Sequence, residues 1–273
     1  MIGNVISNKL VPSEVLLDIN RDMIPSVKLV LDLFNNNKRD FEEFNSSIIG
    51  LERSIFESDM PNYSPDGSVV SSRERVLLCE AYSQWETELE ARFSNKLSDP
   101  SFISCYPLYQ RFERLIAREL KLLNVQKMRS LLFIGSGQFP ISALMYQKAM
   151  GCCVTCLDHN PDAIDSSRNL LRRLNLHHGM DVVCGAGEEW DPSSYDGIVV
   201  AALALPKKAI LSQISSRMRP DTDLICRTTT GLRQLLYKPL ILDEGGCDFG
   251  IAHFAPAEAD DTISSVLLKK KGV

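Results

Sequence analysis

The chain has 273 residues, 44% of them hydrophobic and 24% charged, with a formal net charge of −5. This composition is typical of a folded globular protein, and the slightly acidic balance argues against a general nucleic-acid binder. No apolar run approaches the roughly 20 residues of a membrane span. Residues 1–20 lack the basic start and apolar block of a secretory signal. We therefore expect a cytoplasmic protein with reduced thiols that acts on a small molecule, and neither nucleic acid nor a membrane as partner.

Residues 1–125 carry helical signals. Apolar residues recur at helical spacing within residues 27–34, 41–51, 77–89 and 112–123. Asparagines at 35–37 and the stretch 98–100 are helix stops, and prolines, glycine and serines over residues 60–72 predict a loop. These residues are therefore expected to form an all-α N-terminal domain.

From residue 126 the pattern changes. Short apolar segments at 130–134, 153–157, 180–184, 197–202 and 224–228 alternate with helical ones at 140–150, 161–174 and 206–218. This alternation predicts a mostly parallel sheet with helices on both faces. Segments 248–254 and 264–270 have no room for a crossover helix between them, so they read as a hairpin that closes the sheet with one antiparallel edge strand. The predicted fold class is α/β, with residues 126–273 forming a Rossmann-like domain.

A candidate ligand turn, Gly135-Ser136-Gly137, follows the first predicted strand. Its two glycines let the backbone approach a ligand closely, and Pro140 suits the first turn of a helix. Pro140 also replaces the third glycine of G-x-G-x-x-G, so a plain tight turn is the alternative. Parallel sheets bind ligands outside the carboxyl ends of their strands, and we expect this turn to hold one.

Asp158 ends the second predicted strand, about 20 residues past the glycines, where an acid accepts hydrogen bonds from ribose hydroxyls. Its alternative role is helix capping. Asn160, directly before Pro161, is the better N-cap, which leaves Asp158 to the ligand. Both Asp158 and Asn160 are candidates for cofactor binding.

Small residues follow the next two strands. At residues 185–188 they leave room for a flat base, with Ala186 beside it and Glu188 able to contact an exocyclic amine. Ala202 follows the fourth strand in the same way. Ordinary strand ends are the alternative for both segments.

The cofactor is expected to be S-adenosylmethionine rather than NAD. An NAD enzyme would share the turn and the acid, but usually carries a further catalytic domain after the nucleotide fold. By analogy of fold, a closing antiparallel strand pair is the usual end of an S-adenosylmethionine-dependent methyltransferase-type domain.

Cys153 and Cys156 have the C-x-x-C spacing of a metal or redox site. Their small, apolar and β-branched neighbours predict a strand instead, on which the two side chains would diverge. The eight cysteines contain no second C-x-x-C, so core packing is the preferred reading. The scattered histidines indicate no ligand cluster, and we expect no metal: His159, His177, His178 and His253.

The stretch from Phe133 to Pro140 resembles the F-x-G-S-G-x-x-P motif of nicotianamine synthases. Residues 158–161, 201–203 and 227–233 fit the same family in the same order, and residues 106–109 resemble its F-P-Y-Y. The similarity covers residues 75–240. In size the chain is similar to the family's bacterial relatives that make opine-type metallophores such as staphylopine and pseudopaline.

This resemblance implies a transferase. It would move the 2-aminobutanoyl (3-amino-3-carboxypropyl) group of S-adenosylmethionine to the amine of histidine and release methylthioadenosine, with the metal belonging to the eventual product. Three alternatives stay open: a nicotianamine-like synthase that joins several such units, a methyltransferase of a small amine, and a ligand-binding protein without catalysis. The choice between L- and D-histidine and the oligomeric state, a homodimer included, also stay open.

An attacking amine must be neutral, so a nearby group must accept a proton. Glu80 is our catalytic candidate, at the family's spacing from Tyr106, and its apolar neighbours predict partial burial; a solvated helix glutamate is the alternative. Tyr106 would orient the amine or the donor carboxylate, with Tyr109 as alternate, although either could simply be packed. Arg227 and Arg233 are candidates for a substrate carboxylate, which a guanidinium meets with two parallel hydrogen bonds, or for surface ion pairs.

Overall fold

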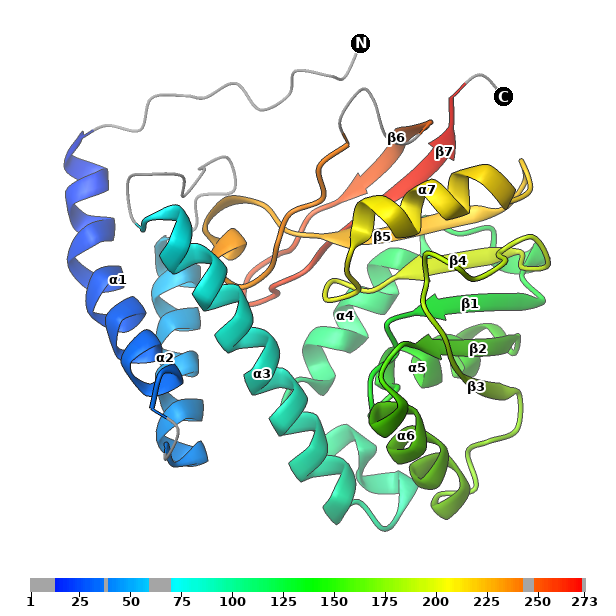
Figure 1. Cartoon of the computed structure of the whole chain (residues 1–273), viewed down its shortest axis with the longest axis horizontal. Helices are drawn as coiled ribbons and strands as arrows, with labels where there is room; N and C mark the ends of the chain where they lie inside the picture. Colours follow the sequence, from blue (N-terminus) through cyan, green and yellow to red (C-terminus); the bar gives the residue numbers. More distant parts are fainter. Residues whose placement is uncertain (1–12, 37–38, 59–69, 243–247, 272–273) are drawn as a thin grey trace. The chain divides into compact units, whose positions relative to one another are not determined.

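The computed structural model describes residues 13–36, 39–58, 70–242 and 248–271 (Figure 1). The chain divides into two compact units. One comprises Met1–Glu86, Thr229–Pro239 and Glu258–Thr262, and the other Thr87–Thr228, Leu240–Ala257 and Ile263–Val273. The predicted division at residue 125 stays a prediction. Within the described ranges, no helix is long and apolar enough to cross a membrane.

The first unit is built from helices, as the sequence predicts. Helices α1 (Ser13–Phe34) and α2 (Phe41–Ser58) pack side by side (Figure 1). They bury the residues of their apolar stripes, Val27 and Val30 on α1 and Phe44 and Ile48 on α2. Helix α1 begins well before the predicted segment. The predicted loop over residues 60–72 lies mainly outside the described residues.

Helix α3 (Ser72–Lys96) contributes its first part to this unit and its last part to the other. The 3-10 helix η3 (Gly231–Leu235) also belongs to the first unit. There the Cys79 thiol on α3 donates to the carbonyl of Leu235 at 3.8 Å.

The second unit contains the sheet. Its helical elements are η1 (Pro100–Cys105), α4 (Tyr109–Leu120), η2 (Val125–Lys127), α5 (Ile141–Met150), α6 (Pro161–Arg173) and α7 (Lys207–Arg217). Its strands are β1 (Ser130–Ile134), β2 (Cys153–Asp158), β3 (Met180–Cys184), β4 (Gly197–Val200), β5 (Asp223–Thr228), β6 (Phe249–Ala255) and β7 (Ser264–Lys270).

The described strands form one sheet in the order β3-β2-β1-β4-β5-β7-β6. Neighbours from β3 to β5 pair in parallel, and β7 is antiparallel to both β5 and β6. The predicted α/β Rossmann-like fold with a closing hairpin is confirmed. The predicted antiparallel edge strand is also confirmed, because β6 forms the edge and pairs antiparallel with β7, which lies inside the sheet. The first five residues of β7 are buried and suit an interior strand, whereas most of β6 is exposed.

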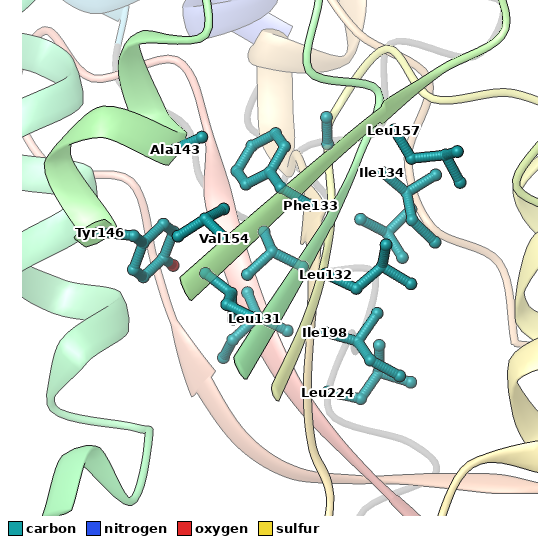
Figure 2. Packing of buried hydrophobic residues seen from close by; sticks show 14 of the residues in the cluster. Leu131, Leu132, Phe133, Ile134, Ala143, Tyr146, Val154, Leu157, Ile198 and Leu224 are labelled. Atoms are coloured by element: carbon teal, nitrogen blue, oxygen red, sulfur yellow. The ribbon is translucent and has the colours of Figure 1, made fainter. Parts of the chain in front are cut away.

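Strand β1 lies at the centre of the core and is buried on both faces. Because side chains alternate along a strand, Phe133 lies with Tyr146 of α5, their ring centroids 6.4 Å apart, while Ile134 points to the opposite side with Leu157 (Figure 2). Its four apolar residues are each at most 3% exposed. This explains why the sequence reads as a continuous apolar run that ends at a glycine turn.

Candidate functional site

The turn after β1 has the backbone that its glycines predict. Gly135 has φ +83° and Gly137 has φ +67°, both in the left-handed region that favours glycine. The N–H groups of Gly135 and Ser136 donate to the carbonyl of Leu157 in β2, at 2.8 and 3.2 Å. The backbone of a tight turn, which the ligand-binding prediction and its alternative both require, is therefore present, and it is fastened to the carboxyl end of the neighbouring strand.

The Ser136 side chain lies within this turn and is only 6% exposed. Its hydroxyl has no hydrogen-bond partner among the described residues. Buried hydroxyls are normally paired, since leaving one without a partner costs about 1–3 kcal/mol. The turn therefore has a hydrogen-bonding group to spare for a ligand.

Asp158 fixes the same turn from the end of β2. Its Oδ2 accepts the Gly137 N–H at 2.9 Å, and its Oδ1 accepts the Asn160 N–H at 3.0 Å. The expectation that Asp158 is left entirely to the ligand is therefore wrong, because two backbone donors already use it. Each carboxylate oxygen has a further lone pair, which suits a hydroxyl of a ligand.

Asn160 is the N-cap of α6, as predicted. Its Oδ1 accepts the Asp162 N–H at 3.0 Å, and Pro161 occupies the first helical turn. The side-chain oxygen of Asn160 is thus used by the helix.

The segments after β3 and β4 begin at the same edge of the sheet as the turn after β1, because β1 to β4 are parallel. Ala186 and Glu188 are half-buried in the first of them. A Cβ added at Gly187 would lie 2.7 Å from Cγ2 of Ile134, so this backbone passes tightly over β1. Ala202, in the second segment, is buried.

Lys207, at the start of α7, was not anticipated from the sequence. Its ammonium group donates to the carbonyls of Ala201 and Ala204, at 3.0 and 3.3 Å, and to that of Ala202. Burial lowers the pKa of Lys207 to about 8 from its ordinary 10.5, and the thiol of Cys226 acts in the opposite direction. A cation in the first turn of a helix interacts unfavourably with the helix dipole, and this unusual position was the feature of the sequence that could have drawn attention to Lys207.

Tyr106 is buried in an aromatic cluster next to the ligand turn. Its ring lies 5.1 Å from those of Phe93 and Phe139, and Phe139 belongs to the stretch that follows Gly137. Tyr109 is half-buried at the start of α4. Glu90 was also not anticipated from the sequence, and its Oε2 lies 3.1 Å from the position of a Cβ on Gly137.

Glu80 is exposed, so the predicted partial burial is wrong. The buried stripe of this part of α3 runs through Leu78, Ala81, Tyr82 and Trp85, at helical spacing. Glu80 lies off that stripe and presents its carboxylate to solvent.

Arg227 is not available to a substrate carboxylate. It is 2% exposed, and its guanidinium donates to both carboxylate oxygens of Glu119, at 3.0 and 2.9 Å, and to the Ser142 hydroxyl at 3.0 Å. The same carboxylate accepts the hydroxyls of Tyr146 and Ser265, at 2.6 and 2.5 Å. This network ties β5 to α4, α5 and β7, and both earlier readings, substrate ligand and surface ion pair, are wrong.

Arg233, in the first unit, is also buried. Its Nε donates to the carbonyl of Asp261 and one Nη to that of Ala259, both at 2.7 Å. The guanidinium therefore fastens the segment Glu258–Thr262, and we correct the prediction that it binds substrate.

The C-x-x-C pair diverges as expected, with Cys156 buried and Cys153 exposed. Core packing is thus right for Cys156 and wrong for Cys153. Burial raises the pKa of the Cys156 thiol to about 12, which makes it unreactive.

A family model described as nicotianamine synthase protein matches residues 68–273. The chain belongs to the nicotianamine synthase family. The resemblance found in the sequence is thereby confirmed. The fold of this family member is similar to that of MtNAS in complex with MTA and tNA, with a TM-score of 0.80 at 22% identity over 93% of this chain and 97% of that one. It is also similar to a Glu-to-Gln variant of MtNAS in complex with S-adenosylmethionine, with a TM-score of 0.69 at 21% identity over 94% and 96%.

Curated relatives of this family member match part of its sequence. An L-histidine 2-aminobutanoyltransferase of Yersinia pestis is 30% identical over 128 residues, 47% of this chain and 48% of that protein. One from Pseudomonas aeruginosa is 29% identical over 126 residues, 46% and 48% respectively. The match spans about half the length of these relatives.

Proposed function

We propose that this chain transfers the 2-aminobutanoyl group of S-adenosylmethionine to the amine of histidine, releasing methylthioadenosine, in the biosynthesis of a nicotianamine-like opine metallophore. The observation that carries the proposal is the similarity to two proteins named L-histidine 2-aminobutanoyltransferase. The donor is supported by a neighbour of the same fold in complex with S-adenosylmethionine.

The edge of the sheet after β1 to β4 suits the adenosine part of this donor. The remaining lone pairs of Asp158 would accept the ribose hydroxyls, and Ala186 and Glu188 would contact the base. The Ser136 hydroxyl, without a partner among the described residues, would gain one from the ligand. Backbone at Gly135 and Gly137 allows the close approach, with Ala202 and Asn160 at the margin of the site.

The reaction is a substitution at the methylene carbon of the aminobutyrate arm, the carbon of that arm that is bonded to the sulfonium. A bond forms from the histidine nitrogen to this carbon while the carbon–sulfur bond breaks, and its electron pair leaves with neutral methylthioadenosine. The amine must lose a proton, and it must lie about 3 Å from the methylene in line with the leaving sulfur. The protein supplies alignment and a proton acceptor.

We assign the proton acceptor to Glu80, whose exposed carboxylate is open to an incoming ammonium group. Tyr106 is assigned to orient the amine or the donor carboxylate, and Tyr109 is the alternate. Tyr106 is supported by its packing on Phe139, which keeps it next to the donor turn.

A nicotianamine-like synthase that joins several aminobutanoyl units is the second candidate. It is favoured by the likeness to MtNAS, which extends over 93% of this chain at a TM-score of 0.80. The two candidates differ in acceptor and in the number of units transferred.

A cytoplasmic location is part of the proposal. The described cysteines are all free, among them the exposed Cys105, Cys153 and Cys184, which suits a reducing compartment. We also propose a homodimer, supported by exposed Ile251 and Phe254 on edge strand β6; sedimentation equilibrium would measure it.

The test is mass spectrometry of products from S-adenosylmethionine with L-histidine, D-histidine or no acceptor. One aminobutanoyl unit on histidine, with equimolar methylthioadenosine, is expected. Products joining several units without histidine would establish the synthase instead. Adenosylhomocysteine would show a methyltransferase, and donor binding without any product would refute catalysis.

A further inference from the structure

Lys207 has its hydrogen-bonding capacity fully used by three backbone carbonyls. A lysine ammonium has three N–H donors. The carbonyls of Ala201, Ala202 and Ala204 accept from it. Its side chain therefore has no N–H left for a substrate, and its effect must pass through the 201–204 segment.

The place of this lysine is unfavourable for folding alone. It is 8% exposed, and it opens α7, where the helix dipole repels a cation. A buried cation bound only by neutral carbonyls gains less than one paired with a carboxylate. Because burying the Lys207 ammonium group at this position costs stability, we infer that it acts on the neighbouring 201–204 segment.

That segment packs directly on the ligand turn. A Cβ added at Gly135 would lie 2.9 Å from Cβ of Ala204 and 3.2 Å from Cβ of Ala201. The Ala201 N–H also donates to the carbonyl of Ile134 at 3.0 Å, and the Ala204 N–H to that of Ala201 at 3.2 Å. A shift of these alanines therefore moves the wall behind the turn.

We propose that Lys207 is a positioning residue that holds the 201–204 segment against the turn at Gly135, in the shape that receives the adenosine of the donor. The identity of the ligand rests on the proposed function; the hold on the segment does not.

The charge of Lys207 gives this role a signature in pH. A neutral amine has two N–H donors, so one of the three carbonyls loses its bond on deprotonation. Because burial lowers the pKa of Lys207 to about 8, we expect this change between about pH 7 and pH 9. Cys226 of β5 is the titratable group that opposes this lowering of the pKa of Lys207.

The first measurement uses the ligand-free protein. Alanine-methyl NMR between pH 6.5 and pH 9.5 follows Ala201, Ala202 and Ala204. We expect their signals to titrate together with a midpoint near pH 8, and to stop titrating in Lys207→Met. Signals that stay constant through this range in the wild type would overturn the proposal.

The second measurement is calorimetric binding of methylthioadenosine, which has no group that titrates in this range. We expect the wild-type Kd to rise about 2- to 10-fold from pH 7 to pH 9, the equivalent of one net hydrogen bond. In Lys207→Met, binding should be weak at both pH values. Lys207→Arg, which stays charged, should bind without pH dependence, and Lys208→Met, next to it and exposed, should match the wild type.

The outcomes separate the two proposals. Wild-type binding in Lys207→Met with an unchanged pH profile would overturn the positioning role, even if the enzyme transfers aminobutanoyl groups. Titrating alanine methyls with a protein that binds methylthioadenosine but makes no product would refute the proposed function and leave the positioning role standing. If the Met variant fails to fold, the wild-type titration and Lys207→Arg still decide.

Discussion

Substituting Gly135 by alanine tests whether the ligand turn is held by close packing as well as by backbone conformation. Gly151, the C-cap of α5, is a matched control. It has φ +64°, close to the +83° of Gly135, but a Cβ there would meet nothing within 4 Å. A Cβ on Gly135 would meet Cβ of Ala204 at 2.9 Å. The two substitutions share the backbone strain and differ in the clash.

The expected magnitudes follow from these two terms. An alanine in the left-handed region costs about 1–2 kcal/mol, which applies to both positions. Overpacking a filled site adds about 1–3 kcal/mol, which applies to Gly135 alone. We therefore expect Gly151→Ala to lower the free energy of unfolding by about 1–2 kcal/mol and Gly135→Ala by about 2–5 kcal/mol.

Urea unfolding measures the cost, and calorimetry with methylthioadenosine measures the effect on the site. Because the added methyl group displaces the wall of the turn, Gly135→Ala should also weaken binding, whereas Gly151→Ala should not. Equal losses of stability in the two variants, or unchanged affinity in Gly135→Ala, would refute the reasoning.

Four other variants test separate parts of the structure. Arg227→Met should lower the free energy of unfolding by about 3–5 kcal/mol, because it leaves the Glu119 carboxylate buried without its cation. Thermal unfolding measures this loss, and adding Glu119→Gln should recover part of it. Above about pH 8, the free energy of unfolding of the wild type should rise by about 1 kcal/mol per pH unit relative to that of Lys207→Met, because the unfolded lysine still binds a proton that the folded one has lost. Chemical unfolding measures this difference between the two proteins, and a difference that does not change with pH would contradict the lowered pKa. Glu80→Gln should reduce turnover at least tenfold without changing methylthioadenosine affinity, and full turnover would exclude it as proton acceptor. Ser136→Ala should leave stability unchanged or raise it by up to about 1 kcal/mol while weakening methylthioadenosine binding, and the opposite pair of results would show that the hydroxyl serves the fold.

The parts of the fold that the sequence predicts are those fixed by short stretches. Strand β1 is a run of four apolar residues, and the glycines after it require a left-handed turn. Asn160 and Pro161 mark the start of α6 within two residues. Strands β1, β3 and β7 therefore begin and end where the residue pattern puts them.

The roles of the arginines depend on residues far away in the chain. Arg227 meets Glu119, which is 108 residues earlier, and Arg233 meets the carbonyl of Asp261, 28 residues later. Both lie in a segment that resembles a family motif, and the motif alone does not distinguish a substrate ligand from a structural one. Only the sheet brings β5 beside the helix that carries Glu119.

The order of the last two strands was left open by the sequence for a related reason. The two segments read equally as a hairpin whichever strand pairs with β5. The choice follows from burial, because β7 supplies five buried residues and β6 leaves Ile251 and Phe254 exposed. The alternation of apolar and polar residues within one strand does not show which neighbouring strand it pairs with.

The ligand turn is held from two sides by side chains that bind backbone rather than a ligand. Asp158 accepts the Gly137 N–H, and Lys207 holds the alanines that pack on Gly135. Fixed in this way, the turn leaves the Ser136 hydroxyl as a buried side-chain group without a hydrogen-bond partner among the described residues. A site that is rigid before its ligand arrives loses little conformational freedom on binding, so under the proposed function most of the interaction with adenosine would remain as affinity. In that function Asp158 and Lys207 would contribute to recognition mainly by fixing the backbone of the turn and of the 201–204 segment.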